Sequence, residues 1–584
     1  MLGKSLFHPF CRAVPLVREK SLISQYSAYV SSAVESSLAD KLIAYTPLAM
    51  VLAISPWQSL DSINLPKLLI LITCAGAVLG ISISHGLATA TRRIPKAAAW
   101  IYAGLFVSLL LTFVTSGSPY IQQFYGASGR NTGLIAYIAL LVFALASIVH
   151  ESEHLVEKFI KGLILGGQVT SVYCLIQFFG ADPIDWNNPY SPILGFLGNP
   201  NFASAFLGIS SVAALVFVFF GKTSNLVRAI YSIQVALSIF LILRSNSQQG
   251  LLVIASGSAV IIGLKIVTTK NSVLLSSYSL LVLVSGVAGI LGMLRIGPLS
   301  GYLYQDSITF RGDYWRAAIN MAGDNPIFGV GLDSYGDWYR RSRTIEATVR
   351  RGPDTISNAA HNVYLDMLAN GGYLLFILYL ASVVLVIRAI VKIAKRGNML
   401  PNSYIALISC WVAFQIQSII SINQLGLAIW GWIFGGLIIG YENNLKIEKP
   451  RRILSKATVP PNQIVASFLG VLLGLAISVP PFYASSQFKS ALESRNANAI
   501  YNSAKAFPLD PIRLTSASTI FIENKMKNKA QELLRLSATK FPSDFQTWSL
   551  ISKSEYFTKD ERDSAIEKMK FLDPNNKSIS IENK

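Results

Sequence analysis

The feature that most constrains the fold of this chain is a series of long apolar runs that contain almost no charge. Residues 65–88, 271–294 and 462–482 are examples. As a helix that rises 1.5 Å per residue, each run is about long enough to cross a hydrocarbon core of roughly 30 Å. Charged residues make up 14% of the chain, whereas soluble domains carry about 25%. The pattern therefore excludes a wholly soluble protein and indicates a polytopic membrane protein.

Thirteen membrane-spanning helices are expected from these runs, since the bilayer admits helices with internally satisfied backbones. The expected ranges are 42–58, 66–87, 98–116, 131–149, 158–178, 202–220, 228–243, 250–268, 273–294, 372–392, 403–421, 425–441 and 463–482. The first range is short and contains Pro47. The fold class is predicted as all-α, with twelve to thirteen membrane helices, a large outer loop that carries amphipathic helices, and a soluble helical tail.

Basic residues fall in alternate loops, and the positive-inside rule places those loops in the cytoplasm. Basic clusters occupy the N-terminal tail and segments such as 91–96 and 388–396. The N-terminus is then cytoplasmic and the C-terminus, after thirteen crossings, extracytoplasmic. The net charge of +19 is explained by topology and lipid headgroups, so membrane lipids rather than nucleic acid are the expected partners.

The C-terminal tail is more polar and contains a weak repeat. Pro508, Pro542 and Pro574 each close a predicted helical stretch, at intervals close to the 34 residues of a tetratricopeptide repeat. Such repeats more often bind a protein partner than catalyse. A generic helical tail remains the alternative.

Four segments follow from these observations. The predicted domain organisation is a cytoplasmic tail over 1–40, a transmembrane domain over 41–445, a basic cytoplasmic linker with the last span over 446–484, and an extracytoplasmic helical domain over 485–584. The transmembrane domain contains the large outer loop, residues 295–371.

This outer loop contains arginines but no lysine. A planar guanidinium suits bidentate recognition of phosphate or carboxylate. The loop also contains acids, so ion pairing within the loop is the alternative. Gly329 and Gly331 indicate a tight turn between an amphipathic helix and the next span.

His361 lies near the C-terminal end of this loop and is the one histidine that the expected topology places outside. An ordinary histidine pKa near 6.5 makes it the natural general base at neutral pH. From position alone, a capping or hydrogen-bonding histidine at the membrane interface is the competing interpretation.

Five segments resemble the O-antigen ligase and O-antigen polymerase superfamily of bacterial membrane glycosyltransferases, which includes O-oligosaccharyltransferases. They are RGDYWRAAINMA (311–322), NPIFGVGLDSY (325–335), HNVYLDMLANGGYLLF (361–376), QFYGASGRNTGLIAY (123–137) and GFLGNPNFASAFL (195–207). Each motif is weak alone, but their order within residues 40–445 is fairly specific.

The resemblance implies a donor glycan on undecaprenyl pyrophosphate at the outer leaflet of the bacterial cytoplasmic membrane. The acceptor would be a hydroxyl of a glycolipid, a glycan or a protein, with no metal or other cofactor. His361 and Arg311 match the catalytic histidine and arginine of the family. The role implied is cell-surface polysaccharide or lipopolysaccharide assembly.

One departure concerns the second arginine of the family, which matches Gln248 in the segment LRSNSQQGLLV. Arg244 lies one helical turn earlier, so Arg244, Gln248 and Arg130 are the candidates for binding the donor pyrophosphate. Asn362, Trp315 and Tyr335 are candidates for contacts with sugars, and packing is the alternative for the aromatic residues.

The leading hypothesis is a glycan transferase of the ligase type. A polymerase or an O-oligosaccharyltransferase of the same superfamily is the alternative within this class. A multi-span transporter is the alternative of another class, although transporters place charged sites at mid-membrane and acids are essentially absent from the apolar runs here.

Overall fold

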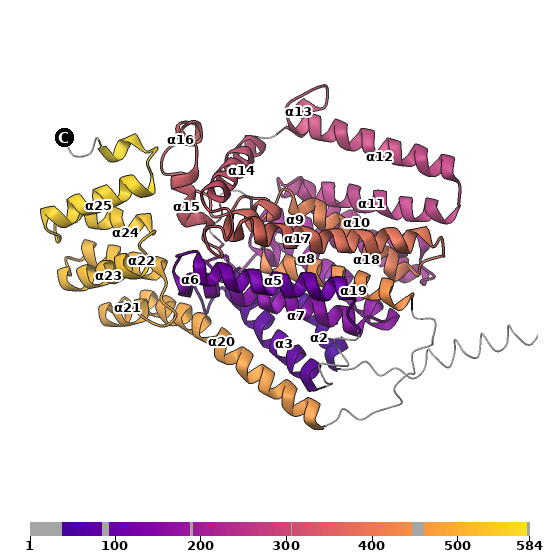
Figure 1. Cartoon of the computed structure of the whole chain (residues 1–584), viewed down its shortest axis with the longest axis horizontal. Helices are drawn as coiled ribbons and strands as arrows, with labels where there is room; N and C mark the ends of the chain where they lie inside the picture. Colours follow the sequence, from indigo (N-terminus) through magenta and orange to yellow (C-terminus); the bar gives the residue numbers. More distant parts are fainter. Residues whose placement is uncertain are drawn as a thin grey trace, which may run out of the picture.

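The computed structural model describes residues 38–84, 93–186, 188, 191–304, 306–446 and 461–580. Across these ranges all regular structure is helical and no strand occurs (Figure 1). The predicted all-α class is confirmed. Most of the N-terminal tail and the basic linker, which the sequence analysis places in the cytoplasm, lie outside the described residues.

Each of the thirteen predicted spans contains a helix, and ten described helices are long and apolar enough to cross a membrane. These ten helices are α3 (Asn64–Ser84), α5 (Lys96–Thr115), α8 (Glu153–Phe178), α9 (Pro200–Phe220), α10 (Asn225–Arg244), α11 (Gln249–Thr268), α12 (Ser272–Met293), α17 (Val363–Lys395), α19 (Leu425–Asn444) and α20 (Pro461–Ser494). The other three are shorter: α2 (Leu38–Leu52), α7 (Leu134–His150) and α18 (Asn402–Ser418).

The first predicted span is longer at its C-terminal end than the helix in the structure, because α2 ends at Leu52 rather than near residue 58. The following residues form a turn instead. The Asp61 carboxylate accepts hydrogen bonds from the backbone N–H groups of Ile63 and Asn64, at 3.1 and 2.8 Å. These bonds satisfy donors at the start of α3 that the helix itself leaves unpaired.

Helices α3 and α20 make the closest crossing in the bundle, and glycine makes it possible. A Cβ atom on Gly76 would lie 2.2 Å from the carbonyl oxygen of Gly470, and a Cβ on Gly470 would lie 2.0 Å from that of Gly76. A Cβ atom on Gly80 would likewise lie 2.1 Å from the carbonyl oxygen of Ala466. Small residues at four-residue spacing allow such contact between membrane helices, and this crossing fixes the helix that leads to the C-terminal domain.

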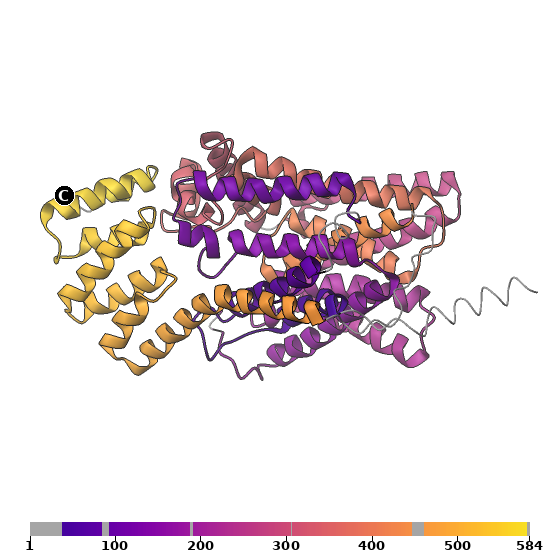
Figure 2. The ribbon, with the colours of Figure 1, turned by 60° about the horizontal axis from the view of Figure 1, so that its bottom comes forward.

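The short helices gather at one end of the bundle, which we call the outer end (Figures 1 and 2). They are α6 (Tyr120–Tyr125), the 3₁₀ turn η1 (Gly195–Leu197), α13 (Ser300–Leu303), α14 (Asp306–Asp324), α15 (Tyr335–Ser342) and α16 (Ile345–Arg351). The predicted amphipathic helix lies within α14, which buries Ala317, Ala318 and Met321 against the rest of the outer loop.

The turn with two glycines packs against a break in α17. Gly372 has a φ of 66°, which separates the first turns of α17 from its membrane-spanning part. The N–H groups of Val330 and Gly331 donate to the carbonyls of Ala369 and Asn370, at 2.9 and 3.1 Å. Gly329 and Gly331 have φ angles of 64° and 113°, so the predicted tight turn is confirmed.

The C-terminal domain is a stack of short helices beyond the outer end (Figure 1). They are α21 (Ala497–Ala504), α22 (Pro511–Glu523), α23 (Lys527–Lys540), α24 (Phe545–Lys553), α25 (Lys559–Leu572) and the 3₁₀ turn η2 (Lys577–Ser580). Helix α22 packs on α23, and α24 packs on α25. As the sequence predicts, each proline segment follows the end of a helix, at Ala504, Lys540 and Leu572.

Candidate functional site

A cavity of about 1210 Å³ lies between the outer end of the bundle and the C-terminal domain. We call it the outer cavity. It is lined by the loops that precede several bundle helices, by α15 of the outer loop, and by two segments of the C-terminal domain. Among its lining residues are Asn131, Gln249, His361, Ser421, Asp337, Arg340 and residues 508–513, 541 and 543–546. A cavity of this size accommodates several sugar units.

His361 reaches this cavity from an unusual backbone position. Its φ of 52° lies in the left-handed region, where residues other than glycine are uncommon. The next residue, Asn362, caps α17, because its Oδ1 accepts hydrogen bonds from the N–H groups of Tyr364 and Leu365 at 3.0 and 3.1 Å. Asn362 therefore positions His361 through its Oδ1, and its contact with a sugar stays a prediction.

The His361 ring is neutral at pH 7. It stacks on Tyr314, with 5.2 Å between ring centroids. Burial, and then the positive charges of Arg311, Arg130 and Arg351, lower the pKa of His361 to about 4. A neutral imidazole on a cavity wall keeps a nitrogen lone pair that can accept a proton.

Arg311 lies beside His361 and retains unused donors. Its Nη1 donates to the Ser307 hydroxyl at 3.3 Å, and its buried Nε has no hydrogen-bond partner. Among the side chains that the structure describes, no carboxylate forms an ion pair with Arg311. Arg351 completes the cluster by stacking over Phe310 at 4.2 Å. Two arginines beside a neutral histidine form a suitable site for an anionic group.

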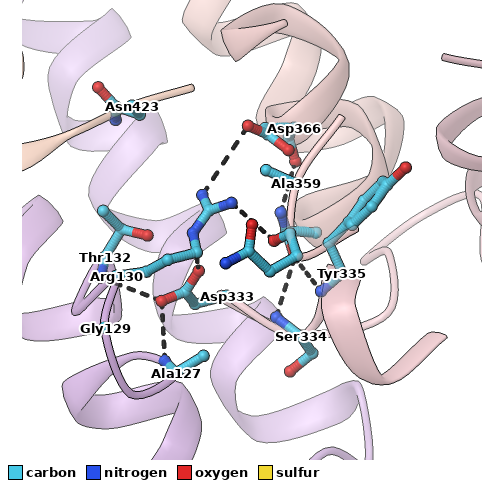
Figure 3. Close-up of polar contacts among 12 residues, drawn as sticks. Ala127, Gly129, Arg130, Thr132, Asp333, Ser334, Tyr335, Ala359, Asp366 and Asn423 are labelled. Carbon is cyan, nitrogen blue, oxygen red and sulfur yellow. Dashed lines mark hydrogen bonds and ion pairs between the residues drawn. The ribbon is translucent and has the colours of Figure 1, made fainter. Parts of the chain in front are cut away.

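Arg130 has a different environment, because two carboxylates already neutralise it (Figure 3). Its Nε lies 3.0 Å from Asp333, and its Nη2 lies 3.9 Å from Asp366. Its Nη1 donates to the Asn358 carbonyl at 2.6 Å. The side chain is 5% exposed. Arg130 thus ties the α6–α7 loop to the outer loop and α17. It also lines the outer cavity, and its contact with a pyrophosphate stays a prediction.

The structure does not bring Arg244 and Gln248 to the outer cavity. Arg244 is exposed at the end of α10 and lies over the rings of Phe178 and Phe240, at 6.0 and 5.5 Å. Gln248 is also exposed. Its neighbour Gln249, the first residue of α11, lines the cavity instead.

The two aromatic candidates pack within the outer loop. Tyr335 is 1% exposed and stacks on Tyr339. Its hydroxyl donates to the Tyr314 carbonyl at 2.8 Å. This burial leaves no face of Tyr335 for a sugar, so the expected sugar contact is not made. Trp315 is partly exposed on α14 and is not among the residues that line the outer cavity.

Three polar residues that the sequence analysis did not identify line the cavity from the bundle side. Asn131, Gln249 and Ser421 are 5%, 5% and 1% exposed. Each has a buried side-chain oxygen without a hydrogen-bond partner. Buried polar atoms are rarely left unpaired, so these oxygens point to a polar ligand. A sequence signal exists, because all three lie at or just before the N-terminus of an apolar helix.

Helix orientation adds positive potential to the bundle side of the cavity, where the Asp61 carboxylate offsets part of it by capping α3. Asn64, Asn201 and Gln249 lie in the first turns of α3, α9 and α11 and line the cavity. The N-terminus of a helix carries about half a positive charge, and its free N–H groups favour anions. Within the described ranges, no group of three or more His, Cys, Asp or Glu residues is arranged to hold a metal ion.

A comparison with family models gives one match, which covers residues 202–380 and is described as O-antigen ligase. The matched segment begins in α9 and ends in α17, so it contains both Arg311 and His361. No curated protein matches the chain. The match and the ten apolar helices agree with the resemblance found in the sequence, and we conclude that residues 202–380 of this multi-pass membrane protein are similar to the O-antigen ligase family.

Proposed function

We propose that the protein transfers a glycan from an undecaprenyl-pyrophosphate-linked donor to an acceptor hydroxyl, at the outer face of the bacterial cytoplasmic membrane. The observation that carries the proposal is the environment of His361. Its neutral ring lines a large cavity beside Arg311, which has donors to spare. The O-antigen ligase family match over the same residues supports this chemistry.

In the proposed reaction, the acceptor hydroxyl oxygen attacks the anomeric carbon of the donor glycan. The bond between that carbon and the pyrophosphate oxygen breaks, and undecaprenyl pyrophosphate leaves with the bonding electrons. His361 takes the proton of the attacking hydroxyl. General-base assistance of this kind typically contributes about 10²–10⁴-fold to the rate.

Positive charge near His361 would stabilise the leaving group. Arg311 and Arg351 lie beside the imidazole, and the N-termini of α3, α9 and α11 face the same cavity. Preorganised donors aimed at developing negative charge contribute about 3–4 kcal/mol each in well-studied enzymes. A bound pyrophosphate also offsets the arginine charges, which raises the pKa of His361. Donor binding thus strengthens the base.

This proposal can be tested by analysing the surface, lipid-linked and protein-linked glycans of a strain from which the gene for this protein has been deleted. A ligase defect leaves complete polymer on the lipid carrier, a polymerase defect leaves single repeat units, and loss of glycan from proteins alone indicates an O-oligosaccharyltransferase. Wild-type protein should restore the normal pattern, and His361→Asn should not. A deletion strain whose surface and protein glycans match the parent strain contradicts the proposal.

A further inference from the structure

The outer cavity is built from two parts of the chain. Its bundle side belongs largely to the segment with the family match and the helices around it. Its other side consists of Asp337 and Arg340 of α15, which lie within that match, and of residues 508–513, 541 and 543–546, which lie outside it. Both views of the molecule show α21–α25 grouped beyond the outer end of the bundle (Figures 1 and 2). The C-terminal domain therefore encloses the space that His361 faces.

Buried ion pairs hold this domain against the outer loop. Asp573, just after α25, accepts hydrogen bonds from Arg343 and Arg340, with ion-pair distances of 2.7 and 3.1 Å. The Arg343 and Asp573 side chains are 1% and 0% exposed. A second contact joins the Ser128 hydroxyl to the Asp510 carboxylate at 2.6 Å. These contacts set the C-terminal segments at a defined position over the cavity.

The two sides of the cavity differ in charge. On the C-terminal side, Arg340 is paired with Asp573, and Arg513 lies 3.7 Å from Asp510. These two arginines are already neutralised, unlike Arg311, which lies near His361 and forms no ion pair with a described side chain. This side is therefore poorly suited to a phosphate group.

Two carboxyl groups at this side remain without a cation. Within the described chain, Asp337 and Asp544 form no ion pair, and both line the cavity. Burial raises the pKa of Asp337 to about 7, and the nearby Asp544 charge adds to the effect. Burial also raises the pKa of Asp544. With a pKa of about 7, Asp337 can both accept and donate hydrogen bonds at neutral pH.

The bundle side supplies independent evidence for the kind of ligand. The unpaired oxygens of Asn131, Gln249 and Ser421 line the same cavity. An oxygen without a partner needs a donor. The carboxyl groups opposite each accept from one neighbouring residue through Oδ2, from Gln122 at Asp337 and from Thr547 at Asp544, and a second oxygen of each carboxyl group remains for a ligand. A molecule with many hydroxyl groups satisfies both sets, because each hydroxyl donates one hydrogen bond and accepts others.

We propose that the C-terminal domain and α15 together form the acceptor half of the active site, and that Asp337 of α15 and Asp544 of the C-terminal domain bind hydroxyl groups of a carbohydrate acceptor. The inference rests on the proposed function, since it assigns the acceptor of that reaction to one side of the same cavity. The domain is then part of the enzyme, in addition to any protein partner that it binds.

Two variants remove the carboxyl groups and keep the local fold. In Asp337→Asn, the amide oxygen can still accept the hydrogen bond that Gln122 donates at 2.7 Å. Asp544 caps α24 by accepting the N–H of Thr547, and serine at this position caps a helix equally well. The matched control is Asp560→Ser, because Asp560 is exposed in the first turn of α25 and does not line the cavity.

The full-length protein is assayed in liposomes with radiolabelled undecaprenyl-pyrophosphate-linked glycan from the deletion strain. The acceptor is the delipidated surface glycan of that strain. Each variant should raise the KM for this acceptor roughly tenfold or more, as expected for the loss of hydrogen bonds to a charged group. The KM for the donor should stay unchanged, and Asp560→Ser should behave as wild type.

An unchanged acceptor KM in both variants, or an equal rise in the donor KM, overturns this inference. In either case an inactive His361→Asn variant leaves the proposed function standing. An active His361→Asn variant contradicts the proposed function itself, so the two failures are distinguishable.

Discussion

At the scale of single residues, the backbone of His361 decides which variant tests its chemistry. The residue has a φ of 52°, a region that asparagine tolerates better than alanine. We predict that His361→Asn keeps the fold and lowers the transfer rate by about 10²–10⁴-fold, the usual contribution of a general base. Thermal unfolding in detergent should match that of wild type. A rate within a few fold of wild type would exclude His361 as the base.

The pKa of His361 provides a second test. Positive neighbours disfavour the imidazolium, so Arg311→Gln should raise the pKa of His361 from about 4 toward its ordinary value. The titration can be followed by NMR of ¹⁵N-labelled histidine. Arg244→Gln is the control, since Arg244 is exposed outside the cavity. An equal shift in both variants, or none in Arg311→Gln, would contradict this electrostatic account.

The same pKa has a consequence for stability. The unfolded chain binds a proton at His361 near pH 6.5, whereas the folded chain binds it only near pH 4. The stabilisation that comes from a neutral His361 is thus complete above pH 6.5 and is lost as the pH falls through about 4. The loss of stability between pH 6.5 and about pH 4 should therefore be smaller in His361→Asn than in wild type, as measured by thermal unfolding at several pH values.

At the scale of elements, the crossing of α3 and α20 can be tested with a single methyl group. In Gly470→Ala the new Cβ meets the backbone oxygen of Gly76, so the helices must separate. Overpacking of this kind costs about 1–3 kcal/mol, and the melting temperature should fall. Gly289→Ala in α12 is the control, because a Cβ there has nothing within 4 Å. Equal melting temperatures for the two variants would contradict the close crossing.

The docking of the C-terminal domain depends on one buried carboxylate. Asp573→Ala leaves Arg343 buried without a counter-ion, which typically costs about 3–5 kcal/mol. Hydrogen exchange should speed up in α24 and α25 and stay unchanged in the bundle helices. Asp563→Ala, at an exposed position of α25, should leave exchange as in wild type. Unchanged protection in Asp573→Ala would show that the ion pair does not hold the domain.

Hydropathy predicted the helices well, because a helix that crosses a bilayer must be apolar along its length. The cluster of Arg311 and His361 was also predictable, since both lie in ordered motifs of one loop. Gln248 was named because it matches the position of the second arginine of the family, and a motif match does not show which of two neighbouring side chains faces the cavity. The partners of Arg130 were missed because Asp333 and Asp366 are far from it in sequence. The two-sided cavity required the relative placement of two domains, which no local pattern contains.

At the scale of the whole molecule, the proposed orientation places the C-terminal domain outside the cytoplasmic membrane, and we propose that its helix pairs are tetratricopeptide-like. Asn524 is exposed at the end of α22, and Lys222 is exposed in the α9–α10 loop. With Cys11 replaced by serine, Asn524→Cys should react with an impermeant maleimide at the outer face of spheroplasts. Lys222→Cys should react only after permeabilisation. The reverse pattern would contradict the orientation.

The central claim is that this molecule moves a glycan from a lipid pyrophosphate with His361 as the base. The most direct measurement uses purified protein in liposomes, with the lipid-linked donor and the surface-glycan acceptor. It quantifies the glycan that is transferred and the undecaprenyl pyrophosphate that is released. The account predicts one equivalent of each per turnover in wild type and loss of both in His361→Asn. Transfer at the wild-type rate by His361→Asn, or no transfer by wild type, would contradict it.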